Sequence, residues 1–438
     1  MKKWLGLDPA LFSVVLIMIS MLGITSNINW GGNNWKTVLE SDAKGYYAYL
    51  PAVFIYNDPN FGFFDEIEKN IYFDENLFYD YRAFVDSRYI SKYYIGTAVV
   101  QMPLFLAAHL YAKMSGITAD GYSKPYMIAI SLSALLCLFT GLFFMNKTFR
   151  YFEVSSQIRA LILFVAVFGT NLFYYTISEP GMSHIYSFAL ISSFFYVLVR
   201  YFEDLKASRL LILAFLFGLI ILVRPVNGLI LLALPIAAGN YERLKSGILV
   251  MFRNLRVLSG SVAIVLAILS IQLLFYKLST GNYLVYSYIG EGFDFTNPHF
   301  FKILFSFKKG LFLYTPVYFL AFLGSIYLWK PERFRFFAWI LFFIVITWVF
   351  SSWSNWWYGG SFSSRVYIEY LPVFMFVLAL ALMKVVNLKV RKALVLILLM
   401  LVVICQIQTY QYRYNHIHWS DMDKQKYFEV FLRVDRLI

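Results

Sequence analysis

Long apolar runs of about 17 to 22 residues, separated by short polar segments, constrain this chain more than any other feature. A helix rises about 1.5 Å per residue, so runs of this length match the hydrocarbon thickness of a bilayer. Hydrophobic residues make up 60% of the chain and charged residues only 14%, well outside the range of soluble domains. The runs also lack the strict alternation of a membrane β-barrel strand. We therefore expect an all-α polytopic membrane protein with about eleven transmembrane helices, near residues 9–27, 126–146, 158–177, 183–200, 209–223, 226–239, 257–276, 311–329, 335–351, 366–384 and 392–409.

Lysines and arginines are concentrated in the short segments that fall on one side when these helices are threaded in order. The positive-inside rule places this side, and the N-terminus, in the cytoplasm. It also accounts for the net charge of +13 without a nucleic-acid partner. Lys2 and Lys3 precede the first apolar run, which we interpret as an uncleaved first helix. The basic segments carry Lys147, Arg150, Arg200, Lys206, Arg209, Arg243, Lys245, Arg253, Arg256, Lys330, Arg333, Arg335, Lys384, Lys389, Arg391 and Lys392.

The opposite side receives the larger polar segments of what we predict to be a single domain, residues 1–438. These segments are a first loop at 28–125, a loop at 278–310 and a C-terminal tail at 410–438. The first loop contains the apolar stretch "YYIGTAVVQMPLFLAAHLYAKM". A transmembrane helix here would move every later basic segment to the other side, so we expect a helix that lies along or dips into the interface.

Asp42 is the first candidate for chemistry, because it stands just after the first apolar run in "ESDAKGYYAYL" together with Glu40 and Tyr46. A carboxylate at the edge of hydrocarbon is costly unless it has a partner or a function. Asp42 is either a helix-cap acid or a general base whose basicity is set by desolvation and a nearby cation.

The segment "YYTISEPGMSHIYSF" joins two predicted helices on the same side and offers Glu179 and His184. Pro180 and Gly181 are explained by a tight turn, whereas the two titratable groups indicate a ligand or metal site. Arg224, in "LILVRPVNGLI", is the most costly residue in the chain and requires an anionic partner. That partner is a buried carboxylate or an anionic ligand such as a lipid phosphate, unless the side chain snorkels.

A further candidate segment is "SSWSNWWYGGSFSSR", which ends at Arg365 and contains Trp356. An interfacial aromatic belt explains its tryptophans, but indole faces also bind sugar rings, and Gly359 and Gly360 permit close approach of the backbone to a ligand. The basic pair Lys308 and Lys309 is typical of a membrane anchor.

The two cysteines predict neither a disulfide nor a metal centre, and the histidines of the C-terminal tail are only weak candidates for one. Cys137 and Cys405 both lie in apolar runs, where packing is the expected role. The spacing of the tail sequence "NHIHWSDMD" is only loosely compatible with a metal, and it has no tetrahedral signature. No cofactor is firmly predicted, although Asp42 and Glu179 leave open a shared divalent ion, Mg²⁺ or Mn²⁺.

The order of "ESDAKGYYAYL", "SKYYIGTAVVQMPLFL", "YYTISEPGMSHIYSF", "LVRPVNGL", "GLFLYTPVYFL" and "WSNWWYGGSFSSR" resembles bacterial members of the GT-C superfamily. The resemblance is to polyprenyl-phosphate-sugar-dependent glycosyltransferases of the protein mannosyltransferase and aminoarabinose transferase type. It implies a large periplasmic first loop with juxtamembrane helices and an essential acid, carried onto Asp42. Lys92, in Lys92-Tyr93-Tyr94, stands where a Lys-Pro-Pro type sequence is common, and this departure leaves donor and acceptor undefined.

The resemblance implies an inverting transfer in the bacterial inner membrane, with the active site facing the periplasm. Asp42 would act as general base, and Arg224 or Arg365 would stabilise the departing lipid phosphate; Lys92, His184, Glu179, Tyr46 and Trp356 complete the candidate donor site. Expected partners are a polyprenyl-phosphate-linked sugar, membrane lipids and an acceptor that is a lipid, a glycan or a protein. The alternatives are a polysaccharide polymerase or ligase and a lipid-linked sugar flippase or transporter.

Overall fold

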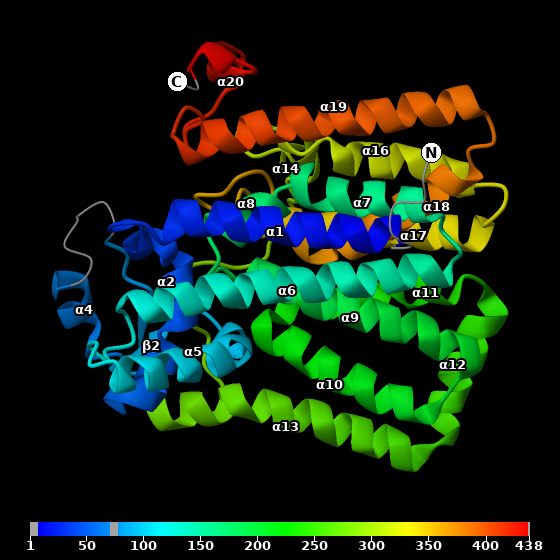
Figure 1. Ribbon diagram of the computed structural model, residues 1–438. Helices are drawn as coiled ribbons and strands as arrows, with labels where there is room; N and C mark the ends of the chain where they lie inside the picture. The colour runs from blue at the N-terminus through cyan, green and yellow to red at the C-terminus, as the bar shows by residue number, and fades with distance from the viewer. Residues whose placement is uncertain (1–7, 71–77, 437–438) are drawn as a thin grey trace.

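The computed structural model describes residues 8–70 and 78–436, so the predicted basic pair Lys2 and Lys3 lies outside the described residues. Within the described part, seven helices are long and apolar enough to cross a membrane. They lie side by side along a common direction (Figure 1). They are α1 (Pro9–Asn29), α6 (Lys124–Tyr151), α9 (Ser183–Asp204), α13 (Leu255–Thr280), α17 (Arg333–Ser351), the segment Arg365–Lys384, formed by η6 (Arg365–Tyr370) and α18 (Leu371–Lys384), and α19 (Leu388–Arg413).

Four shorter apolar helical segments occupy the remaining predicted positions. Each is less than 18 residues long, so length alone does not establish that it crosses a bilayer. One of the predicted boundaries is a true break, because Arg224 has extended backbone (φ −152°, ψ 114°) between two helical segments. The four are α7 (Ser156–Phe168), α10 (Ala207–Val223), the pair η4 (Pro225–Ala233) and α11 (Leu234–Ala238), and the pair α16 (Val317–Gly324) and η5 (Ser325–Leu328).

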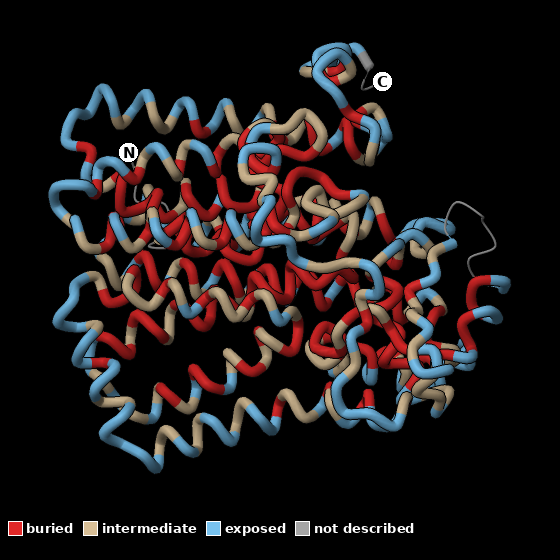
Figure 2. Tube along the Cα trace, turned by 180° about the vertical axis from the view of Figure 1, so that it is seen from behind, coloured by how far each residue is buried: buried red, intermediate tan, exposed pale blue. Residues whose placement is uncertain are grey.

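The outermost long helices expose apolar side chains on their outer faces, whereas a soluble protein buries most such side chains in its core. Only 11% of the apolar window of α13 and 17% of that of α19 are buried, compared with 94% for Arg365–Lys384. Figure 2 shows the buried residues in the middle of the bundle and exposed ones along its outer helices. Exposed leucines, isoleucines and phenylalanines on a helix bundle require an apolar solvent, so the chain is a multi-pass membrane protein.

The first loop forms a small subdomain at one end of the bundle, where α2, α4, β2 and α5 are labelled in Figure 1. Its predicted interfacial helix is α5, over Gly96–Met114. The all-α prediction missed a hairpin here, in which Arg82 pairs with Ser91 and Val85 with Arg88. Asp86 and Ser87 both have positive φ, as a tight two-residue hairpin turn requires. The elements are η1 (Asn34–Val38), α2 (Asp42–Tyr47), α3 (Tyr49–Pro51), η2 (Ala52–Tyr56), α4 (Phe64–Asn70), β1 (Arg82–Val85), β2 (Arg88–Ser91) and α5.

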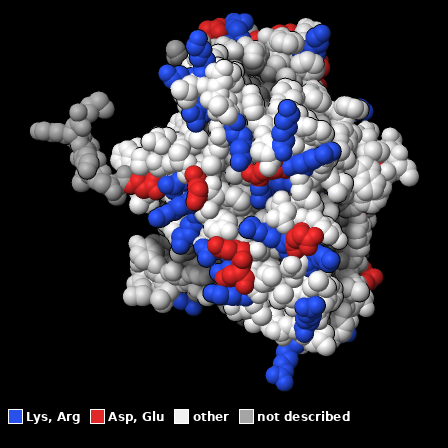
Figure 3. Space-filling view, turned by 90° about the vertical axis from the view of Figure 1, so that its right-hand side faces the viewer, with Lys and Arg blue, Asp and Glu red and all other residues white. Residues whose placement is uncertain are grey.

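The basic segments lie at the opposite end of the bundle, near the labels α11 and α12 in Figure 1. Figure 3 shows this end face, on which lysines and arginines gather with fewer acidic residues between them. The predicted threading therefore holds to the extent that the basic segments share one end. The remaining elements are α8 (Leu172–Ile177), α12 (Tyr241–Arg253), α14 (Phe300–Phe305), α15 (Leu311–Tyr314), α20 (Lys424–Val430) and η7 (Val434–Arg436).

Candidate active site

Asp42 is the first residue of α2 and is held by three side chains from distant segments. Its Oδ2 accepts a hydrogen bond of 2.6 Å from Arg365 Nη2, while its Oδ1 accepts from the hydroxyls of Tyr93 at 2.7 Å and Tyr79 at 3.2 Å. Burial alone would raise the pKa of Asp42, but the Arg365 guanidinium and the Tyr93 hydroxyl outweigh it and hold that pKa below its usual value. Asp42 is therefore an ionised, fully partnered carboxylate.

Close backbone packing fixes the position of α2. A Cβ on Gly181 would lie 2.8 Å from Ala43 Cβ, and a Cβ on Gly45 would lie 2.4 Å from the Tyr93 ring. The Gly45 carbonyl also accepts from Ser91 Oγ at 3.0 Å. Since alanine fits neither position without displacement, α2 is wedged between the Gly181 turn and the hairpin strand that leads to Tyr93.

A second ion pair has one member, Glu369, on the same short helix as Arg365, and its other member is Arg224. Glu369 Oε1 accepts from Arg224 Nη1 at 2.7 Å and lies 2.9 Å from His184 Nδ1. Glu369 is fully buried, and its Oε2 has no hydrogen-bond partner among the described residues. The anionic partner required by Arg224 is thus a buried carboxylate, which the sequence analysis had left open against a ligand. Arg224 lies at the backbone break between α10 and η4, and Glu369 lies in η6, so this ion pair links the break to η6.

Tyr46 is near both ion pairs. The charges of Arg224, Asp42 and Arg365 all act on its hydroxyl, although burial, which raises the pKa of Tyr46, is the larger effect. Its ring lies 4.7 Å from the ring of Tyr93. The site is therefore walled by aromatic hydroxyls that can donate hydrogen bonds but do not ionise near neutral pH.

Glu179 is close enough to this cluster for the charges of Arg365 and Asp42 to act on it, but among the described residues no hydrogen bond or ion pair joins it to His184. Burial raises the pKa of Glu179 to about 8. The charge of Arg365 partly opposes this increase, and the nearby Glu40 and Asp42 carboxylates add to it. Its Oε2 is buried and has no hydrogen-bond partner among the described residues. Glu179 is therefore mostly protonated at pH 7, in contrast to Asp42.

Lys92 and Trp356, the two remaining predicted residues, differ in their relation to Asp42. Lys92 forms an ion pair with Glu291 of the 278–310 segment, and its charge contributes to the low pKa of Asp42. Trp356 packs against His299, with ring centroids 5.6 Å apart, and no hydrogen bond or ring contact within the described ranges joins it to Asp42 or Arg365. The structure thus brings Lys92 to the edge of the site and leaves Trp356 apart.

Four residues of the cluster escaped sequence reasoning. Glu369 is hidden in an apolar run, Tyr79 and Tyr93 are two of 34 tyrosines, and Lys309 was assigned to an anchor although it is only 2% exposed. A signal existed only for Glu369, because a lone acid in an apolar run has to meet a cation such as Arg224.

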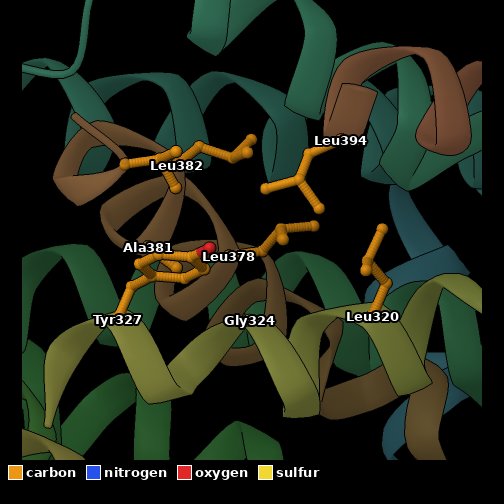
Figure 4. A pocket seen from close by; sticks show the side chains of 8 residues that line it. Leu320, Gly324, Tyr327, Leu378, Ala381, Leu382 and Leu394 are labelled. Carbon is orange, nitrogen blue, oxygen red and sulfur yellow. The ribbon is translucent and has the colours of Figure 1, made fainter. Parts of the chain in front are cut away.

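The described residues bring no three His, Cys, Asp or Glu side chains together in a way that could hold a metal ion. The apolar depression in Figure 4, lined by leucines of α16, α18 and α19, carries no carboxylate and is not a candidate site. The chemistry of the described chain is therefore concentrated around Asp42, Arg365, Glu369 and Arg224.

The sequence matches no protein-family model and no curated protein. The fold, however, matches solved structures. One is the archaeal oligosaccharyltransferase AglB from Archaeoglobus fulgidus in complex with an inhibitory peptide and a dolichol-phosphate (TM-score 0.51, 10% identity, 96% of this chain and 57% of that chain). Another is the oligosaccharyltransferase of Archaeoglobus fulgidus in the apo form (TM-score 0.52, 11% identity, 99% and 60%).

This chain has the GT-C fold. At such low identity the likeness concerns the fold alone, and this chain spans less than two thirds of either archaeal chain. The GT-C fold that the sequence resemblance implies is therefore confirmed.

Proposed function

We propose that this chain is a membrane glycosyltransferase that moves a sugar from a polyprenyl-phosphate-linked donor to an acceptor, with inversion at the anomeric carbon. The observation that carries the proposal is the Asp42–Arg365 pair, an ionised carboxylate beside a half-buried guanidinium at the end of a GT-C bundle. A base and a phosphate-binding cation side by side are what a single displacement on a sugar phosphate requires. The dolichol-phosphate bound by AglB supports a lipid-linked donor.

The pair also suggests how the base becomes active. In the free site, Arg365 and two tyrosine hydroxyls occupy both oxygens of Asp42, so the carboxylate is a weak base. A donor phosphate that recruits Arg365 removes the main cation holding the pKa of Asp42 down, and its basicity rises when the donor is in place. Asp42 then takes the proton of the acceptor hydroxyl or amine as the acceptor atom attacks the anomeric carbon.

The bonds made and broken balance without a redox partner. The acceptor forms a bond to the anomeric carbon, the bond from that carbon to the phosphate oxygen breaks, and the lipid phosphate leaves with the bonding electrons. Arg365 and Arg224 offset the charge that develops on the leaving oxygen, while His184 and Glu369 hold Arg224 in place. If a Mg²⁺ or Mn²⁺ ion takes part, Asp42 and Glu179 are the carboxylates that would bind it.

We further propose that the chain crosses the membrane eleven times, counting the seven long helices and the four shorter apolar segments. The basic end then faces the cytoplasm and the Asp42 end faces the periplasm of a bacterial inner membrane. The acceptor is a lipid, a glycan or a protein; the peptide bound by AglB supports the last of these for the archaeal enzyme only.

The proposal is tested by glycan transfer in membranes that contain the wild-type chain or Asp42→Asn. We expect the variant to lose transfer by roughly 10²- to 10⁴-fold, the usual contribution of a general base. Equal expression and retained binding of polyprenyl phosphate are the controls. Full activity of Asp42→Asn would contradict the proposal and favour a polymerase, ligase or flippase whose essential charges are the arginines.

A further inference from the structure

Lys309 is a buried cation that the proposed reaction does not yet use. It precedes α15 and is 2% exposed, and its Nζ donates to the Ser361 carbonyl and lies 4.7 Å from the centre of the Tyr412 ring. No carboxylate of the described chain lies within ion-pair distance of Nζ, as the complete set of ion pairs in the described ranges shows. Buried ammonium groups are normally paired, so this one is costly to keep without a function.

The backbone around Lys309 directs the side chain inward. The amide of Gly310 donates to the Ser306 carbonyl at 2.7 Å, and a Cβ at Gly310 would lie 2.6 Å from that same oxygen. The Tyr314 hydroxyl closes the turn on the Phe307 carbonyl at 2.6 Å. The tight turn at Gly310, where a side chain does not fit, therefore fixes the position of Lys309. A lysine that only anchors a helix at the membrane surface does not require such a fixed position.

The partner of Lys309 leads directly to Arg365. Ser361 begins the segment that precedes η6, and this segment is held by Phe362 N donating to the Tyr175 hydroxyl at 3.1 Å and by Ser363 Oγ bonding Thr315 Oγ1 at 3.0 Å. Arg365 follows two residues later. Lys309 is close enough to Arg365 for the two charges to repel, and Glu179 stands near both.

We propose that Lys309 binds the same phosphate group as Arg365. The inference rests on the proposed function, since it adds a second cation to the donor-phosphate site. An ammonium has three donors, and Nζ of Lys309 uses one of them on Ser361, so two remain for phosphate oxygens. A bound phosphate supplies the counter-ion that the protein does not.

The surroundings of Lys309 predict that phosphate binding is accompanied by proton uptake, which can be measured. Burial lowers the pKa of Lys309 to about 7. The charge of Glu179 partly opposes this shift, whereas the positive charges of Arg365 and Lys308 add to it. The Tyr412 ring of α19 also faces Lys309 but carries no charge. At pH 8 the free side chain is mostly neutral. A phosphate dianion that binds beside it favours the ammonium, so binding draws a proton from solution.

The experiment is isothermal titration of the full chain in nanodiscs with farnesyl phosphate at pH 8, in two buffers of different ionisation enthalpy. We expect the wild-type chain to take up roughly half to one proton per ligand bound, because a side chain with a pKa near 7 is mostly unprotonated at pH 8. Lys309→Met should bind at least tenfold more weakly without this uptake, whereas Lys309→Arg should bind but take up no proton. Lys302→Met, an exposed lysine of the same segment, is the matched control and should behave as wild type.

The outcomes separate the inference from the function on which it rests. Wild-type affinity and proton uptake in Lys309→Met overturn the inference, as does equal weakening in Lys302→Met. No binding of farnesyl phosphate to the wild-type chain overturns the proposed function as well. Inorganic phosphate and farnesol distinguish the source of the phosphate. If inorganic phosphate causes Lys309-dependent proton uptake as strongly as farnesyl phosphate does, and farnesol causes none, the phosphate site is supported. The ligand is then assigned as free phosphate instead of a lipid headgroup.

Discussion

Asp42 and Glu179, two carboxylates whose charges act on Arg365, differ in protonation state at pH 7. Asp42 is kept ionised by the guanidinium and by tyrosine hydroxyls, whereas Glu179 forms no ion pair within the described ranges and burial raises its pKa to about 8. Environments that separate the pKa values of neighbouring acids are characteristic of sites that transfer protons. In the proposed function, Asp42 is the base, and the protonated Glu179 keeps negative charge low around the donor phosphate.

Glu179 predicts a pH-dependent stability difference. Its pKa is raised in the folded state, so from about pH 4.5 to about pH 8 the folded chain holds a proton that the unfolded chain has lost. Stability from this residue therefore falls as pH rises through that window. We expect Glu179→Gln to melt at the same temperature as wild type at pH 4 and at an increasingly higher temperature up to pH 8.

Thermal denaturation in detergent over this pH series is the measurement. Glu66→Gln, an exposed acid of α4, is the control and should follow the wild-type curve throughout. A constant difference between Glu179→Gln and wild type at every pH would show that Glu179 is ionised in the folded chain.

Metal removal tests the role of Arg365 as counter-ion. Arg365 already occupies Oδ2 of Asp42, and the described chain offers no third ligand beside Asp42 and Glu179. We expect transfer by wild type to be unchanged after treatment with EDTA and unaffected by added Mg²⁺ or Mn²⁺. Activity that EDTA abolishes and either ion restores would assign Asp42 to a metal site.

At the scale of elements, the site depends on close contacts between backbones. A Cβ on Gly96, at the start of α5, would lie 2.3 Å from the Leu222 carbonyl carbon and from Val223 N, at the end of α10. This contact fixes the juxtamembrane helix directly beside Arg224.

We expect Gly96→Ala to lower stability by about 1–3 kcal/mol, the usual cost of overpacking, because two backbones must separate. It should also reduce transfer, since Arg224 moves with α10. Gly23→Ala, a helical glycine of α1 with no atom within 4 Å of its Cβ position, is the matched control and should leave both unchanged. Melting temperature and transfer rate are the two readouts, and wild-type values for Gly96→Ala would show that this contact relaxes freely.

The sequence predicted the long helices well and the site only in part, for a physical reason. Hydropathy is a local property, so each apolar run identifies its own helix. The partners of Asp42 come from positions 79, 93 and 365, and only tertiary packing decides which of many tyrosines and arginines reach it. Arg224 and Asp42 were selected as candidates because charges near hydrocarbon are rare, and the β1–β2 hairpin was missed because four-residue strands leave little pattern.

At the scale of the whole molecule, the arrangement predicts a sidedness that can be measured. Cys137 and Cys405 are both buried, so the wild-type chain should give little background labelling by thiol reagents. We expect an impermeant maleimide to label Asn297→Cys in intact bacterial cells and Ser246→Cys only after the cells are made permeable. The reverse pattern would invert the proposed orientation and place Asp42 in the cytoplasm.

The short helix η6 carries one member of each ion pair, Arg365 and Glu369, on successive turns. Removing Arg224 alone leaves Glu369 as an unpaired buried charge, which costs about 3–5 kcal/mol. Natural variation should therefore pass through paired changes, so that sequences without an acid at position 369 also lack an arginine at position 224. Correlated changes at positions 224 and 369 among related sequences would then identify this contact, which a single sequence does not reveal.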